Sequence, residues 1–215
     1  MEETLRIFIY IHAFFGGLGL IAGLGSITVK KGNLLHKRLG KLFSVGMIIS
    51  SLISIPISWL PNHKNLFLFL IGIFTIYLVV SGNRMITFKS RKKKHANAID
   101  KITSGTMLIL SSFMIVLGVY GLFNGHYVHI LFILFGGFGL FLTVMDFIFY
   151  KNLSNPTNNW LINHVRKMIG ALIASITAFI VAGLGIGNLI AWILPSVIGT
   201  IYIIYWRRKL TANTE

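Results

Sequence analysis

Seven long stretches of the chain consist almost entirely of apolar residues, and basic or polar residues separate them. A helix needs about 20 apolar residues to cross the hydrocarbon core of a bilayer, which is about 30 Å thick. The pattern therefore predicts an all-α bundle of seven transmembrane helices. The predicted spans are Ile7–Val29, Leu39–Leu60, Leu66–Ile86, Ile99–Phe123, Tyr127–Tyr150, Met168–Gly187 and Leu189–Trp206.

Composition excludes the main alternatives to a membrane protein. Of the 215 residues, 55% are hydrophobic and only 12% are charged, whereas a soluble domain is roughly 25% charged. A disordered chain would have low hydrophobicity. The chain contains no cysteine, which excludes disulfides, thiolate metal sites and a cysteine nucleophile.

The basic residues predict the direction in which the helices cross. There are 20 Lys and Arg against 5 Asp and Glu, and 18 of the 20, all except Arg6 and Lys64, fall on alternate loops. Cytoplasmic loops are enriched in Lys and Arg, so we predict an N-terminus outside and a C-terminus inside. This topology explains the net charge of +15 without a nucleic-acid partner. The expected partner is the bilayer, and the basic run Arg91–Lys94 would attract anionic lipid headgroups. Acids precede the first span, so we expect that span to be retained and not cleaved as a signal peptide.

Three short motifs occur twice, in the same order, and indicate an internal duplication. Phe15–Leu20 resembles Phe135–Leu140, His36–Arg38 resembles His164–Arg166, and Thr75–Tyr77 resembles Thr200–Tyr202. The sequence thus predicts one membrane domain, 1–215, with a 3+1+3 plan of parallel repeats. The halves would cover about 1–86 and 127–210, joined by a helix at about 99–123. The glycines favour tight helix packing.

Polar groups near the middle of the predicted spans are limited to hydroxyls, because no Asp, Glu, Lys or Arg lies there. Ionisable residues inside the membrane are typical of ion-coupled transport, so the sequence argues against a proton-driven or sodium-driven transporter. Ser50, Ser54 and Ser58 recur at helical spacing. They would either line a polar path or bond to the preceding turn of their own helix or across a helix contact.

Histidines near the predicted outer face are candidate cofactor ligands. His12 lies within the first span, and His126 and His129 precede the fifth, which is its repeat partner. Imidazoles from facing helices can hold haem b, and together with His126 or His63 they can hold a transition metal. The alternative is that these histidines bond to neighbouring hydroxyls or carbonyls.

A second group lies near the predicted inner face, at the starts of the second and sixth spans and the end of the fifth. Its members are His36, Arg38, Asp146, His164 and Arg166. Arginine and imidazole beside a helix N-terminus suit an anion such as a lipid phosphate or a carboxylate. The same group would suit a quinone headgroup or, with Asp146, a His/His/Asp metal site. The alternative role of Asp146 is a structural salt bridge.

At these residues the chain resembles a bacterial family of uncharacterised multi-pass predicted membrane proteins, described as a domain of unknown function. The resemblance rests on Leu35–Gly40, Gly82–Arg84, Asp146, His164–Phe179 and the tail from Pro195 to Trp206. It implies a multi-pass protein of the bacterial inner (cytoplasmic) membrane, and it brings no catalytic role with it.

The leading functional hypothesis is a haem-binding or metal-binding membrane protein of electron transfer, with the inner group as a quinone or second cofactor site. The alternative is an uncoupled facilitator for a small solute. A zinc-dependent membrane hydrolase and a non-catalytic scaffold are further alternatives. The sequence leaves the ligand, the reaction and the oligomeric state open.

Overall fold

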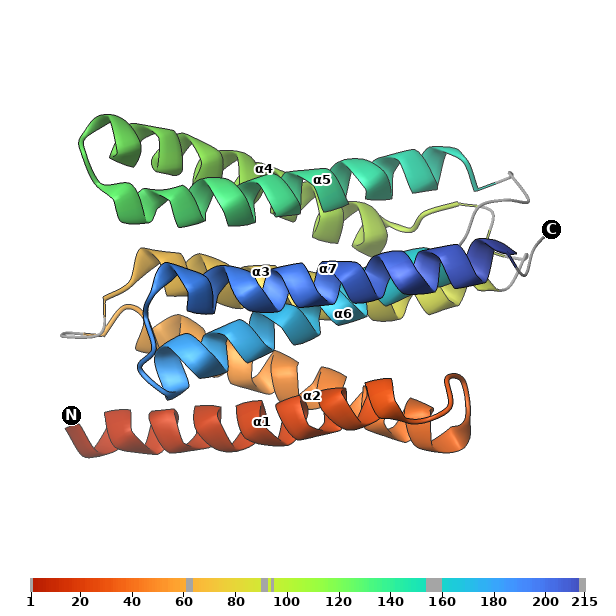
Figure 1. The fold of residues 1–215 in the computed structure, drawn as a ribbon, viewed down its shortest axis with the longest axis horizontal. Coiled ribbons are helices and arrows are strands. Elements are labelled where there is room, and N and C mark those ends of the chain that lie inside the picture. Colours follow the sequence, from red (N-terminus) through yellow and green to blue (C-terminus); the bar gives the residue numbers. More distant parts are fainter. Residues whose placement is uncertain (1, 61–63, 90–92, 94, 154–159, 213–215) are drawn as a thin grey trace. The chain divides into compact units, whose positions relative to one another are not determined.

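The computed structural model describes residues 2–60, 64–89, 93, 95–153 and 160–212. Within these ranges the chain forms seven long α-helices and no strand (Figure 1). They are α1 Glu2–Thr28, α2 Leu34–Ile57, α3 Leu66–Met85, α4 Ala98–Phe123, α5 Ile130–Lys151, α6 Trp160–Ala178 and α7 Leu189–Ala212. All seven are long and apolar enough to cross a membrane, which confirms the predicted all-α fold and is consistent with a multi-pass membrane protein.

Three short helical segments extend or connect these helices. The 3₁₀ segment η1, Ile86–Lys89, follows α3, and the 3₁₀ segment η2, Tyr127–His129, precedes α5. The π-helical segment η3, Phe179–Gly183, continues α6. His63 and most of the basic run Arg91–Lys94 lie outside the described residues.

The second and sixth helices begin earlier than the apolar pattern predicts. Helix α2 begins at Leu34 and not at Leu39, because Asn33 accepts a hydrogen bond from the His36 main-chain N–H at 2.7 Å and caps the helix. Helix α6 begins at Trp160 and not at Met168. A helix starts where its backbone hydrogen bonds start, and polar residues can occupy that first turn. The apolar pattern therefore places the starts of α2 and α6 too late. His36 and His164 therefore lie inside helices.

The chain divides into two compact units. Unit 1 is Met1–Asn83 with Ile162–Glu215, and it contains α1, α2, nearly all of α3, most of α6, and α7. Unit 2 is Arg84–Leu161, and it contains α4 and α5. Helix α5 therefore belongs to a different unit from α7 and most of α6. The 3+1+3 duplication, its two halves and the orientation across the membrane stay predictions.

Small residues bring the helices of unit 1 close together. A Cβ at Gly46 of α2 would lie 2.8 Å from the Phe15 main-chain oxygen and 3.0 Å from the Gly19 backbone of α1. A Cβ at Gly82 of α3 would lie 2.9 Å from Met168 Sδ on α6. Figure 1 shows α1, α3 and α7 running in one direction and α2 and α6 in the other. These contacts agree with the prediction that the glycines serve tight packing.

Unit 2 is a hairpin of α4 and α5 that also packs through glycine. A Cβ at Gly136 of α5 would lie 2.9 Å from the Ser111 main-chain oxygen on α4. At one end of the unit, Met85, Phe88 and Phe149 form a buried apolar cluster.

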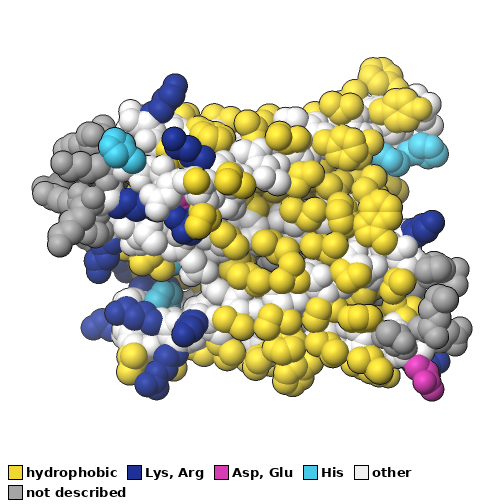
Figure 2. Space-filling model, turned by 180° about the vertical axis from the view of Figure 1, so that it is seen from behind, with side chains coloured by type: hydrophobic (Ala, Val, Ile, Leu, Met, Phe, Trp, Pro, Cys, Tyr) yellow, Lys and Arg dark blue, Asp and Glu magenta, His cyan; other side chains and the backbone are white. Residues whose placement is uncertain are grey.

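The surface suits lipid better than water. Large apolar side chains on α1, α2, α4, α5 and α7 are exposed, including Ile21, Ile109 and Ile190, which are each about 70% exposed. Figure 2 shows hydrophobic side chains over the middle of the helices and Lys and Arg toward their ends. Soluble monomers rarely expose such continuous apolar surface.

Candidate functional site

His12 joins α1 to α2. Its Nδ1 lies 2.9 Å from the Ser50 main-chain oxygen and 3.0 Å from Ser50 Oγ, and that hydroxyl donates to the His12 main-chain oxygen at 3.0 Å. A carbonyl only accepts hydrogen bonds, so Nδ1 carries the proton. Nε2 is therefore the ring nitrogen that this anchor leaves free of a carbonyl partner.

His36 is held in the same way at the start of α2. Its Nδ1 lies 3.0 Å from the main-chain oxygen of Ser26, near the end of α1. That carbonyl also accepts a bond from Lys31 Nζ at 3.2 Å. Lys31 additionally donates to the carbonyls of Ile27 and Val29, and so caps the end of α1. Partial burial lowers the pKa of Lys31.

His164 repeats this arrangement on a second pair of helices. Its Nδ1 lies 2.8 Å from the main-chain oxygen of Gly82, near the end of α3. The His36 and His164 imidazoles are near enough to interact electrostatically. We call the end of unit 1 that holds His36, His164 and Trp206 the basic end, because Lys31 Nζ lies 5.7 Å from the Trp206 ring centre there.

Three histidines of unit 1 thus have the same hydrogen-bonding arrangement. His12, His36 and His164 each donate Nδ1–H to a main-chain carbonyl of another helix. Within the part of the chain that the structure describes, Nε2 of these three rings has no hydrogen-bond partner. The contacts of His12 with the Ser50 carbonyl and hydroxyl match the alternative predicted for the outer histidines. The particular carbonyls leave no mark in the sequence, because every residue has one.

The other members of the predicted inner group, Arg38, Arg166 and Asp146, lie in different surroundings. Arg38 is exposed on the first turns of α2. Arg166 is half-buried on α6, where it interacts electrostatically with Arg207. Asp146 belongs to unit 2, so its predicted grouping with His36 and His164 stays a prediction.

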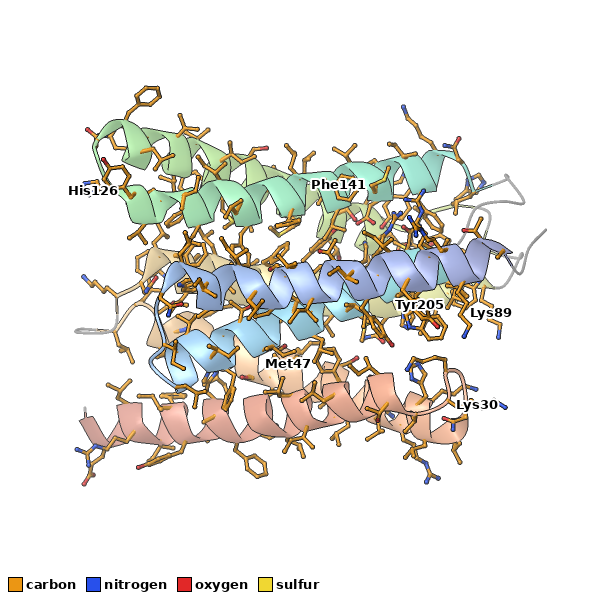
Figure 3. The ribbon with its side chains drawn as sticks, in the orientation of Figure 1. Lys30, Met47, Lys89, His126, Phe141 and Tyr205 are labelled. Carbon is orange, nitrogen blue, oxygen red and sulfur yellow. The ribbon has the colours of Figure 1, made fainter. Side chains whose placement is uncertain are left out.

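The predicted outer ligands also fall in different units. His126 and His129 stand at the loop between α4 and α5 in unit 2, where Figure 3 labels His126. Their ring centres are 5.5 Å apart. His12 belongs to unit 1, so the haem-ligand pair of His12 and His129 stays a prediction.

Asp100 carries a charge network that sequence reasoning missed. Its buried carboxylate pairs with Arg84 Nε and with Lys93 Nζ, the latter at 2.8 Å. It also accepts the Asn97 main-chain N–H at 2.8 Å at the start of α4. The spacing Asn97-x-x-Asp100 is typical of a helix capping box, and that pattern would have revealed part of the network.

Asp146 is tied to the same end of unit 2 by hydroxyls. Ser104 Oγ on α4 donates to Asp146 Oδ2 on α5 at 2.7 Å, and it lies 3.1 Å from the Tyr150 hydroxyl. Asp146 is 1% exposed. The hydroxyl therefore supplies one of the hydrogen bonds that a buried carboxylate requires.

Lys167 corrects the expectation that no charged residue lies well inside a span. Because α6 begins at Trp160, Lys167 lies seven residues inside this helix, and only 2% of it is exposed. Its Nζ lies 5.0 Å from the ring centre of Tyr77. The argument against ion-coupled transport therefore does not hold for the sixth span.

Two of the three serines in the α2 stripe bond to their own helix, whereas Ser50 bonds across to His12 on α1. Ser54 Oγ donates to the Ser51 main-chain oxygen at 2.8 Å, and Ser58 Oγ donates to the Ile55 oxygen at 2.6 Å. These bonds match the prediction that the hydroxyls bond to their own helix. They give no support to a polar path for a solute.

Among the described residues, no three His, Asp or Glu side chains group closely enough to hold a metal ion together. A three-ligand catalytic zinc site has no support in this part of the chain. No family model, curated protein or solved structure matches the chain.

Proposed function

We propose that the protein binds haem or a transition metal in the membrane and transfers electrons, with His36 and His164 as ligands. The observation that carries this proposal is the shared state of the two imidazoles at the basic end of unit 1. Each Nδ1 is held by a carbonyl, at 3.0 Å from Ser26 and at 2.8 Å from Gly82. Each Nε2 lies outside these hydrogen bonds, and its lone pair would be the one that binds a metal.

This hydrogen-bonding arrangement is the one that is typical of a metal-binding histidine. A histidine that binds a metal through one ring nitrogen nearly always donates the other N–H to a carbonyl, a carboxylate or water. The hydrogen bond fixes the tautomer and raises the basicity of the ligand. Helices α2 and α6 would each contribute one such imidazole, anchored on α1 and α3 respectively.

The surrounding charge favours an anionic cofactor. Lys31 and Arg207 belong to the basic end, and the described residues of unit 1 include no acid there. A haem carries two propionate groups, and cationic side chains near the headgroup region would neutralise them. The same charge would suit an anionic lipid headgroup or the polar end of a quinone.

The test is an absorbance spectrum and a metal analysis of one purified sample. The protein is expressed in haem-replete and metal-replete cells and purified in detergent with a tag that contains no histidine. We expect a Soret band or a stoichiometric metal that both His36→Ala and His164→Ala remove. The matched control is His95→Ala, because His95 is exposed and belongs to no anchored pair.

Chemical rescue distinguishes ligation by these rings from a purely structural role. In His164→Gly, imidazole added to the buffer should restore the spectrum, whereas it would not repair a merely destabilised helix. A colourless and metal-free wild-type preparation from replete cells would exclude the proposal. An unchanged spectrum in both alanine variants would exclude these two residues as the ligands.

We further propose that the chain lies in a bacterial cytoplasmic membrane with its N-terminus outside. The 18 basic residues on alternate loops support this orientation. Because the chain has no cysteine, single variants Asn33→Cys and Asn124→Cys report the two faces. An impermeant maleimide should label Asn124→Cys in intact cells and Asn33→Cys only after lysis. The opposite labelling would reverse the topology.

A further inference from the structure

Two histidines at the loop end of the α4–α5 hairpin are held beside each other by one glycine. The His126 main-chain N–H donates to the Gly121 oxygen at 2.9 Å, and the His129 N–H donates to the His126 oxygen at 3.0 Å. A Cβ at Gly121 would lie 2.1 Å from His129 Cγ. The missing side chain of Gly121 therefore seats the His129 ring against α4.

The spacing of the two rings matches a shared metal ion. Their centres are 5.5 Å apart and their planes are inclined by 37°. Two imidazoles on one tetrahedral or tetragonal metal place their ring centres about 5 Å apart, given metal–nitrogen bonds of about 2.0–2.1 Å. The ring centres of the pair are therefore about as far apart as those of two imidazoles that share one ion.

One ring nitrogen in this pair lacks a partner. His129 Nδ1 is buried and makes no hydrogen bond within the described structure. A buried polar atom without a partner costs about 1–3 kcal/mol. A metal ion bound at this nitrogen would supply the missing partner. His126 is exposed, which leaves an entry path and room for water as further ligands.

We propose that His126 and His129 form a binding site for divalent copper at the loop end of unit 2. Two imidazoles completed by water give a tetragonal set of nitrogen and oxygen ligands, which is diagnostic of Cu²⁺ or Ni²⁺. Among the first-row divalent ions, Cu²⁺ binds such a site most tightly. The site uses none of His12, His36 and His164, so it is independent of the proposed cofactor at the basic end.

The experiment is a titration of the full chain with Cu²⁺ in detergent, again with a tag that contains no histidine. Equilibrium dialysis against a glycine competitor measures affinity, and electron paramagnetic resonance counts the nitrogen ligands. In the His12→Ala/His36→Ala/His164→Ala background, where the basic end cannot contribute, we expect one Cu²⁺ with two imidazole nitrogens. His126→Ala and His129→Ala should each weaken binding at least about tenfold, the loss caused by removing even an outer partner of a metal ligand.

Two further variants keep the test decisive. His126→Asn changes an exposed side chain, so it should reduce Cu²⁺ affinity without altering the melting temperature, even if His129→Ala fails to fold. The triple variant His12→Ala/His36→Ala/His164→Ala should retain this copper site. Unchanged affinity in His126→Ala and His126→Asn would overturn the proposal. A spectrum with fewer than two nitrogen ligands in the wild type would also overturn it.

Discussion

The α1–α2 hairpin of unit 1 and the α4–α5 hairpin of unit 2 both pack through glycine. Gly19 of α1 and Gly139 of α5 occupy the same place in the similar segments Phe15–Leu20 and Phe135–Leu140, and both face the neighbouring helix. Gly17 and Gly137 have nothing within 4 Å of an added Cβ. The neighbour differs, because α1 packs on the helix that follows it and α5 on the helix that precedes it.

The polar chemistry of the two hairpins is different. Unit 2 places two carboxylates, Asp100 and Asp146, in buried positions and balances them with cations and hydroxyls. The α1–α2 hairpin uses imidazoles and main-chain carbonyls, with no acid among these contacts. A buried carboxylate needs its protein partners, whereas an anchored imidazole retains a nitrogen for a ligand. We therefore expect charge to stabilise unit 2, and the cofactor proposed at the basic end to bind in unit 1.

Asp100→Ala should produce the largest loss, because among the described residues the buried ion-pair network lies in unit 2. Removing a fully buried partner costs about 3–5 kcal/mol. Arg84 and Lys93 retain 22% and 15% side-chain exposure, so we expect about 2–3 kcal/mol in unfolding free energy, below that fully buried cost. Unfolding in sodium dodecyl sulfate, followed by circular dichroism, measures it.

The control is Lys101→Ala, which changes the exposed neighbour of Asp100. An exposed substitution should stay within about 0.5 kcal/mol of wild type. Equal stability of the two variants would show that the network does not stabilise unit 2, and the contrast between the hairpins would fail.

Gly46→Ala and Gly118→Ala should destabilise the two hairpins equally, because glycine packing is what they share. The added Cβ would lie 2.8 Å from the Phe15 oxygen in one hairpin and 3.0 Å from the His129 oxygen in the other. Backbone atoms cannot turn aside as a side chain can. We expect each variant to lose about 1–3 kcal/mol, the usual cost of overpacking, in the same detergent assay.

Gly17→Ala and Gly137→Ala are the matched controls, since both face open space. Alanine favours a helix over glycine by about 1 kcal/mol, so these variants should be as stable as wild type or slightly more stable. A loss at Gly17 similar to the loss at Gly46 would contradict the packing assignment.

The apolar runs predicted the seven helices because burial in lipid needs continuous hydrophobicity, and this requirement is written along the chain. The same hydropathy criterion placed the start of α6 at Met168. Hydropathy does not detect the polar first turns of this helix, which contain Asn163, Arg166 and Lys167. The helix begins at Trp160, which moves Lys167 from a loop into a buried position.

Candidate ligands were predictable only as residue types. The depth of His36 and His164 follows from their place relative to the apolar runs, yet their anchors are the carbonyls of Ser26 and Gly82. Every residue has a carbonyl, so no sequence pattern marks these acceptors. The partner Ser104 of Asp146 lies 42 positions away on another helix, and only the fold joins them.

Ser104→Ala tests how far unit 2 depends on hydroxyl support for a buried acid. The variant removes the 2.7 Å bond to Asp146 and the 3.1 Å contact with Tyr150. Removing a hydrogen-bond partner from a buried polar group costs about 1–3 kcal/mol, and we expect a loss within that range. Ser112→Ala is the control, because Ser112 is exposed and bonds only to Leu108 of its own helix. A similar loss in both variants would assign the effect to helix propensity.

Ser50→Ala is the corresponding change in the α1–α2 hairpin, and it should have the smallest effect. The variant loses the hydroxyl bond to the His12 main-chain oxygen, worth about 0.5–1.5 kcal/mol. The bond from His12 Nδ1 to the Ser50 main-chain oxygen at 2.9 Å remains, so the tautomer of His12 is preserved. Ser54→Ala, whose hydroxyl bonds to Ser51 of the same helix, provides the baseline. If Ser50→Ala destabilised the protein as much as Ser104→Ala does, the hydroxyl and not the carbonyl would be the anchor. The α4–α5 hairpin, with its buried acids, and the α1–α2 hairpin, with its histidine bonded to a carbonyl, would then no longer differ in this respect.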